Sequence, residues 1–171
     1  MKAFDRALGM VSMALAWVAC AIIPVLFTMI VVDVSIRTLG GRPPAFTSAV
    51  VEYALLYVAM FSAPFLVREK GHVAIEAVIA NLPKFLQRFL AMLVYITCML
   101  AAALFTYFSC MLFWENWSTN QLDTRSIDVP YWLQFLPMAI GFAMVSLELL
   151  MYVAGRRHYY SYDLGEVKDG V

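Results

Sequence analysis

Four long apolar runs in this sequence are almost free of charge, and they constrain the fold more than any other feature. They cover residues 7–32, 45–67, 89–114 and 130–154. The first and third runs contain no charged residue, and the other two contain one glutamate each, Glu52 and Glu148. Each run is longer than the roughly 20 residues that an α-helix needs to cross the hydrocarbon core of a bilayer. The sequence therefore predicts four transmembrane helices.

Composition supports a membrane protein and excludes several other classes. Hydrophobic residues make up 63% of the chain and charged residues 14%, against about 45–50% and about 25% in ordinary soluble domains. The net charge is zero, so there is no basic excess of the kind that nucleic-acid binding requires. Disorder is excluded as well, because it needs low hydrophobicity and high net charge. We expect an all-α integral membrane protein in which residues 1–171 form a single membrane domain.

The connection between the second and third spans contains one more predicted helix. Within residues 73–82, Ile75, Val78, Ile79 and Leu82 follow the i, i+3, i+4, i+7 spacing of one helical face. This segment is too short to span a bilayer. We expect a short amphipathic helix that either lies in the membrane interface or packs on the ends of the transmembrane helices.

The distribution of lysine and arginine predicts the orientation of the spans. Nine of the twelve basic residues lie in the amino-terminal segment, the central connection and the carboxy-terminal tail, whereas three lie in the first and third loops. Loops rich in basic residues stay in the cytoplasm. We therefore expect a multi-pass membrane protein with both termini in the cytoplasm.

Few residues could carry chemistry. The two histidines, His72 and His158, lie outside the predicted spans, where they could not hold a haem between helices. The three cysteines all lie inside apolar runs, where a thiol behaves as a small hydrophobic group. No metal-ligand spacing, phosphate-binding glycine loop or nucleophile–base pair is present. We predict no catalytic, cofactor-binding or metal-binding residue, and no enzymatic activity.

Glu52 is one of two acids inside the predicted spans, where an ionisable group suggests a function. It lies near the outer end of the second span, within reach of Arg37 and Arg42 in the first loop. Arg37 also follows Asp33 by four residues, the spacing of a helical ion pair. We interpret Glu52 chiefly as a structural charge that pairs with Arg37, with Arg42 or with a basic group of a partner protein. Proton or sodium coordination and simple interfacial solvation remain alternatives.

Glu148 is the second acid, near the inner end of the fourth span. The nearest basic residues in the sequence are Arg156 and Arg157, which a glutamate at this depth could approach. The same three interpretations apply to it. A structural ion pair or hydrogen bond is favoured, because transport sites are usually built at the bilayer midplane.

Two groups of residues resemble one transporter family. The first runs from Glu52-Tyr53 through Ala63-Pro64-Phe65 into Arg68-Glu69-Lys70-Gly71-His72-Val73 and ends at Leu82-Pro83. The second comprises Ser126-Ile127-Asp128-Val129-Pro130-Tyr131-Trp132, then Leu136-Pro137 and Gly141. In order and spacing they resemble the small, DctQ-like membrane subunit of tripartite ATP-independent periplasmic (TRAP) transporters. Chain length, span number and predicted topology agree with this resemblance, which implies a location in the bacterial inner membrane.

The resemblance implies a transporter of three parts. A periplasmic substrate-binding protein captures an organic anion such as a carboxylate or sialic acid, and a large, DctM-like membrane subunit moves it with sodium. The small subunit binds the large one and enlarges its static scaffold, while the substrate and sodium sites belong to the large subunit. Candidate partner or structural residues in this chain are Arg37, Arg42, Glu52, Arg68, Lys70, His72, Pro130, Trp132 and Glu148.

Two other functions stay open on the sequence. The chain could be the membrane anchor of a respiratory complex, which a haem absorbance spectrum would reveal. It could also be an autonomous four-helix carrier, which transport in liposomes containing this chain alone would reveal.

Overall fold

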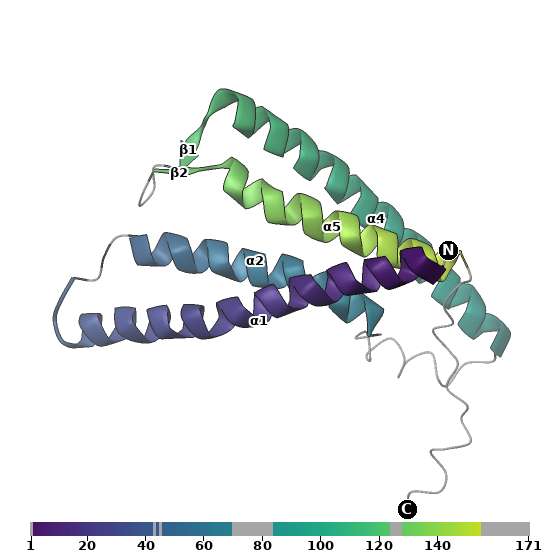
Figure 1. Cartoon of the computed structure of the whole chain (residues 1–171), viewed down its shortest axis with the longest axis horizontal. Helices are drawn as coiled ribbons and strands as arrows, with labels where there is room; N and C mark the ends of the chain where they lie inside the picture. Colours follow the sequence, from purple (N-terminus) through teal and green to yellow (C-terminus); the bar gives the residue numbers. More distant parts are fainter. Residues whose placement is uncertain (1, 43, 45, 70–83, 124–127, 155–171) are drawn as a thin grey trace, which may run out of the picture.

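The computed structural model describes residues 2–42, 44, 46–69, 84–123 and 128–154, and within them the chain is built from helices. The helices are α1 (Lys2–Thr38), α2 (Phe46–Arg68), α4 (Lys84–Thr119) and α5 (Trp132–Val153) (Figure 1). All four are long and apolar enough to cross a membrane. The predicted all-α membrane fold with four spanning helices is therefore confirmed. The predicted amphipathic helix at 73–82 lies outside the described residues.

The first helix is longer than the apolar run that predicted it. The ion pair between Arg37 Nε and Asp33 Oδ2, at 2.8 Å, links successive turns and carries α1 beyond the apolar run. The helix then ends in a Schellman motif, in which Gly41 N donates to Ile36 O and Gly40 N donates to Arg37 O. Gly40 adopts a φ of 78°, a conformation that glycine reaches without steric cost.

The fourth helix begins two residues later than its apolar run. Residues 129 and 130 form β2 (Val129–Pro130), which pairs antiparallel with β1 (Leu122–Asp123). The connection between α4 and α5 is therefore a short two-stranded bridge. Pro130 is tolerated there because it lies at the edge of the pair.

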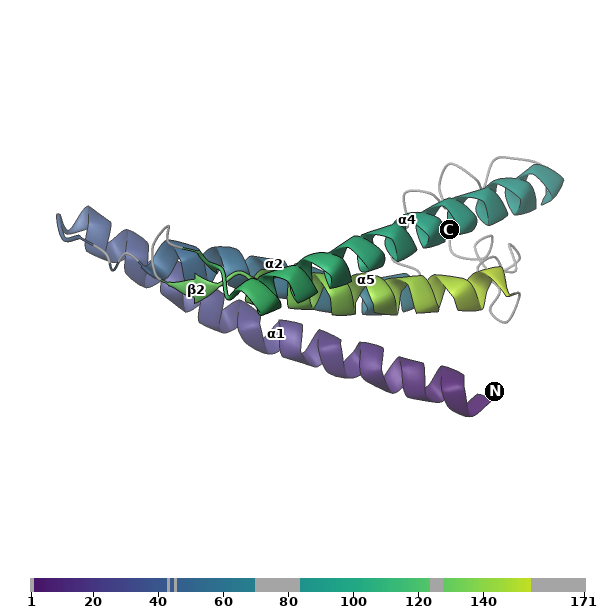
Figure 2. The same ribbon diagram turned by 90° about the horizontal axis from the view of Figure 1, so that it is seen from above.

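The helices form a twisted row rather than a closed bundle. Helix α1 packs on α2, α2 packs on α5, and α5 packs on α4. Figures 1 and 2 show α1 and α4 at opposite edges of this row, with α2 and α5 between them. One end of the row, the hairpin end, holds the α1–α2 turn and the β1–β2 bridge. The other, the amino-terminal end, holds the start of α1 and the end of α5.

The two edge helices each make contact through one narrow seam. The less exposed residues of α1 include positions 5, 8, 12, 15, 19, 22, 26, 29, 33 and 36, and those of α4 include 95, 99, 102, 106, 109, 113 and 116. The spacing between these positions alternates between three and four residues, which gives the average period of 3.5 residues typical of helices that pack side by side. Large apolar side chains such as Trp17 and Phe27 point away from the seam of α1 and are exposed. The edge helices therefore present wide apolar surfaces to lipid or to a partner protein.

The central helices, α2 and α5, approach each other closely at a glycine. A Cβ atom at Gly141 would lie 2.6 Å from the backbone oxygen of Met60. Small residues permit this backbone approach in membrane proteins. Towards the hairpin end, the Tyr57 hydroxyl donates to Leu133 O at 2.9 Å, so α2 and α5 are also joined by a hydrogen bond.

Candidate functional site

A buried ion pair joins α2 to α5 at the amino-terminal end of the row. Arg68, in the last turn of α2, donates from Nη1 to Glu148 Oε1 at 3.1 Å. The side chain of Glu148 is completely buried, and that of Arg68 is 23% exposed. A buried carboxylate is tolerated only when it is paired and hydrogen-bonded. Arg68 supplies the compensating charge.

Helix α1 completes the coordination of this ion pair. The Ser12 hydroxyl donates to the same Glu148 oxygen at 2.8 Å, and Ser12 is itself fully buried. Arg68 Nη1 and Nη2 both lie 3.5 Å from the backbone oxygen of Asp5, and Nη2 lies 3.9 Å from Asp5 Oδ1. One guanidinium group therefore connects three helices.

A glycine makes room for this guanidinium group. A Cβ atom at Gly9 would overlap the guanidinium carbon of Arg68. Gly9 lies one turn after Asp5 on α1, so the side chain of Arg68 passes over the bare backbone to reach the Asp5 carbonyl. The contact with Arg68 therefore requires a residue without a side chain at position 9 of α1.

Tyr152 ties the end of α2 to α5 and α4. Its hydroxyl donates to the backbone oxygen of Arg68 at 3.0 Å, one of the carbonyls that a helix end leaves without an internal partner. Its ring stacks on Tyr95 of α4 with centroids 5.5 Å apart. We call Asp5, Ser12, Arg68, Glu148 and Tyr152 the Arg68 cluster. It holds together the four helices near one membrane face.

The chemistry of the Arg68 cluster is that of a structural junction. Its carboxylate is already engaged by a guanidinium and a hydroxyl, and its guanidinium is engaged by a carboxylate and a carbonyl. Across the part of the chain that the structure describes, no group of three or more His, Cys, Asp and Glu residues is placed to hold a metal ion. The cluster is arranged to fix helix positions.

The predicted approach of Arg156 or Arg157 to Glu148 falls outside the described residues and stays a prediction. Among the described residues, the Glu148 carboxylate accepts from Arg68 and Ser12, which are 80 and 136 residues away in the sequence. A structural role for Glu148 is consistent with this geometry. No local sequence pattern links these residues. The one indication in the sequence is that Arg68 ends an apolar run, where an arginine can reach a buried carboxylate.

The expected pairing of Glu52 within this chain is not observed. Arg37 is engaged by Asp33, and Arg42 is exposed on the loop that follows α1. Glu52 is exposed on α2, and it has no ion pair or hydrogen bond among the described residues. Pairing of Glu52 with a basic group of another protein stays a prediction.

The remaining candidate residues lie in different places. Trp132 begins α5 and packs against Trp117 of α4, with ring centroids 4.9 Å apart, and Phe113 joins them at 6.2 Å from Trp132. Pro130 belongs to the β1–β2 bridge beside this aromatic group. These rings lie at the hairpin end, as interfacial aromatic residues do. Lys70 and His72 lie outside the described residues.

Comparison with known proteins identifies one family. The sequence model described as "Tripartite ATP-independent periplasmic transporters, DctQ component" matches residues 26–157, which is more than half of the chain. The matched range contains the whole of α2, α4 and α5, and with them Arg68, Glu148 and Tyr152. No curated protein and no solved structure gives a significant match.

Proposed function

Because the chain belongs to the family of DctQ components of tripartite ATP-independent periplasmic transporters, we propose that it binds a large membrane subunit and enlarges its static scaffold. It is a small, multi-pass membrane component of a transporter, and its family is not an enzyme family. In the proposed complex, a periplasmic substrate-binding protein delivers an organic anion, such as a carboxylate or sialic acid. The large subunit then carries the anion inward with sodium.

The arrangement of the helices in a row carries this proposal. A carrier needs a polar site that surrounding helices shield from lipid, usually near the midplane. Here α1 and α4 lie at opposite edges, and the buried carboxylate of Glu148 is already engaged by Arg68 and Ser12. Such a row is suited to lie against another membrane protein. We therefore assign the substrate and sodium sites to the large subunit and expect no cofactor in this chain.

The exposed stripe of α2 is the face that we assign to the large subunit. It contains Glu52, Leu55, Ala59 and Leu66, all exposed and spaced along one side of the helix. An ionised carboxylate that faces hydrocarbon is costly unless another group satisfies it. A basic side chain of the large subunit would supply that group, and Ala59 would allow its helix to approach.

Orientation follows from the basic residues. We propose that the amino-terminal end of the row faces the cytoplasm and the hairpin end faces the periplasm, because nine of the twelve lysines and arginines belong to the amino-terminal segment, the central connection and the carboxy-terminal tail. The Arg68 cluster then fixes the cytoplasmic ends of the helices.

Reconstitution tests the proposed function. Liposomes containing both membrane subunits, supplied with the binding protein and a sodium gradient, should take up the anion, and those containing this chain alone should not. Copurification of the two membrane subunits should not require the anion. Sodium-driven uptake by this chain alone, or full transport by the large subunit in its absence, would overturn the scaffold role.

A further inference from the structure

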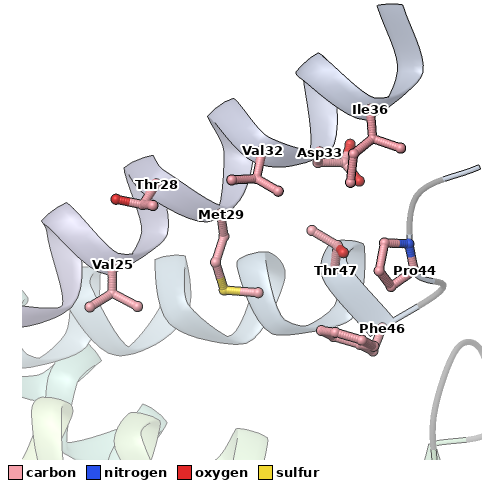
Figure 3. A pocket seen from close by; sticks show the side chains of 9 residues that line it. All are labelled: Val25, Thr28, Met29, Val32, Asp33, Ile36, Pro44, Phe46 and Thr47. Carbon is pink, nitrogen blue, oxygen red and sulfur yellow. The ribbon is translucent and has the colours of Figure 1, made fainter. Parts of the chain in front are cut away.

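A groove between α1 and α2 lies at the hairpin end, far from the Arg68 cluster. Its volume is about 370 Å³. Figure 3 shows its wall, to which α1 contributes Val25, Met29, Val32 and Asp33, and α2 contributes Phe46 and Thr47. In this set only Asp33 and Thr47 are polar. Thr28 also lines the groove, but its hydroxyl donates to Pro24 O of its own helix at 2.8 Å. The groove therefore has a mainly apolar length and a polar end.

The polar end contains a buried acceptor that lacks a donor. Asp33 Oδ1 is buried and has no hydrogen-bond partner among the described residues, whereas Oδ2 accepts from Arg37 Nε at 2.8 Å. A buried, unsatisfied carboxylate oxygen is destabilising and calls for an explanation. A donor from outside the chain would satisfy it.

The charges around this end are of both signs. The side chain of Arg37 is 61% exposed, whereas that of Asp33 is only 16% exposed. An external group would therefore meet a recessed carboxylate oxygen that accepts hydrogen bonds beside an accessible guanidinium that donates them. This pairing is complementary to a zwitterion in which a cationic donor and an anionic acceptor lie close together.

The position of the groove along α1 indicates its surroundings. Val25, Met29 and Val32 belong to the charge-free run, and Asp33 is the first charged residue after it. The apolar part therefore lies at the depth of acyl chains and the polar end at the depth of lipid headgroups. In a bilayer, an apolar groove at this depth is in contact with hydrocarbon.

We propose that this groove binds one phospholipid with a zwitterionic, primary-amine headgroup of the ethanolamine type. One acyl chain lies along Val25, Met29 and Val32. The ammonium group donates to Asp33 Oδ1, and the phosphate accepts from the guanidinium of Arg37. A primary ammonium provides three N–H donors. A trimethylated choline headgroup has the same charge and no N–H donor, and an anionic glycerol headgroup lacks the cation.

Native mass spectrometry of the purified full-length chain tests the proposal. The probes are phosphatidylethanolamine, phosphatidylcholine and phosphatidylglycerol with identical acyl chains. We expect the ethanolamine lipid to bind about tenfold more tightly than either of the others, the effect of one charge-assisted hydrogen bond. Equal retention of the three lipids would overturn the proposal without any variant.

Two substitutions test the two parts of the site. Asp33→Asn should reduce the preference for the ethanolamine lipid to near unity, and Val25→Trp, at an exposed position that faces the groove, should lower the retention of all three lipids. Glu115→Gln is the matched control, because it removes an exposed carboxylate at the hairpin end of α4 and should change nothing. Circular dichroism confirms that each variant is folded. An unchanged preference in folded Asp33→Asn would contradict the site.

Crosslinking in native membranes distinguishes a lipid from a protein occupant. A photoreactive residue replacing Met29, which lines the groove, should label lipid. Labelling of another membrane protein at this position would show that a protein occupies the groove and would overturn the lipid site.

Discussion

Replacing Arg68 by methionine should destabilise the chain by about 3–5 kcal/mol, the usual cost of removing one member of a buried ion pair. Glu148 is completely buried, so water does not readily replace the lost guanidinium. Ser12 would still donate to the carboxylate at 2.8 Å, which offsets part of the loss. Arg68 also binds the Asp5 backbone oxygen, and that contact is lost in the same variant.

The reverse substitution should cost less. In Glu148→Leu, Arg68 loses one partner but keeps its contacts with Asp5. Its side chain is already 23% exposed and can turn its guanidinium towards the headgroups. We expect a loss of about 1–3 kcal/mol, the usual penalty for an unsatisfied polar group. The difference between the two single variants follows from the unequal burial of the two charges.

The double variant separates the ion pair from the packing around it. When Arg68→Met and Glu148→Leu are combined, no buried charge remains, so the loss should be smaller than in Arg68→Met alone. Hydrophobic replacement of a whole buried ion pair is often close to neutral. The loss of unfolding free energy in the double variant should therefore be at least about 2 kcal/mol smaller than the sum of the two single losses. This difference is within the usual range of coupling energies.

Equilibrium unfolding in mixed detergent micelles, followed by circular dichroism, measures these free energies. Ser35→Ala is the matched control. This exposed hydroxyl donates to Val31 O of its own helix, so its removal should change stability by less than about 0.5 kcal/mol. Single effects that add within about 0.5 kcal/mol would refute the ion pair as an energetic unit.

Three further predictions concern the membrane faces and contacts. Glu52→Gln should weaken assembly with the large subunit by about 1–3 kcal/mol without changing the sodium dependence of uptake; a shifted sodium stoichiometry in a normally assembled complex would place Glu52 in the ion pathway. Gly141→Ala should lower unfolding stability by about 1–3 kcal/mol, because its Cβ would meet the backbone oxygen of Met60; an unchanged stability would contradict the close crossing. A cysteine replacing Gly41 should react with impermeant reagents from the periplasm, and one replacing Gly165 only from the cytoplasm; the reverse pattern would invert the topology.

The sequence predicted the spanning helices well because a physical length is imposed on them. A helix that crosses hydrocarbon needs about 20 apolar residues, and this requirement is visible in any window of the chain. Helix ends were less predictable. The extension of α1 past residue 32 depends on the Asp33–Arg37 pair, which the spacing did indicate, whereas the delayed start of α5 depends on a strand pairing between Val129 and Asp123 that the spacing did not indicate.

The sequence did not predict which helices pack together or which charged residues pair. Lipid-facing and helix-facing positions are both apolar in a membrane protein, so hydropathy could not show that the helices form a row. For Glu148, sequence proximity indicated Arg156 and Arg157, which lie outside the described residues, and it gave no sign of Arg68, which folding brings to Glu148 from 80 residues away. Arg37, one of the partners predicted for Glu52, instead pairs with Asp33, which lies four residues earlier on the same helix.

The long sequence separation within the Arg68 cluster has a consequence for biogenesis. During synthesis α1 and α2 emerge first, so Arg68 enters the membrane boundary well before Glu148 and Tyr152 have been translated. The junction can close only after α5 has been inserted, and until then the first hairpin lacks the contacts that fix its angle to the rest of the chain. A nascent chain that stops before residue 148 should therefore remain a substrate for membrane quality control. The last helix to arrive completes the arrangement of the first.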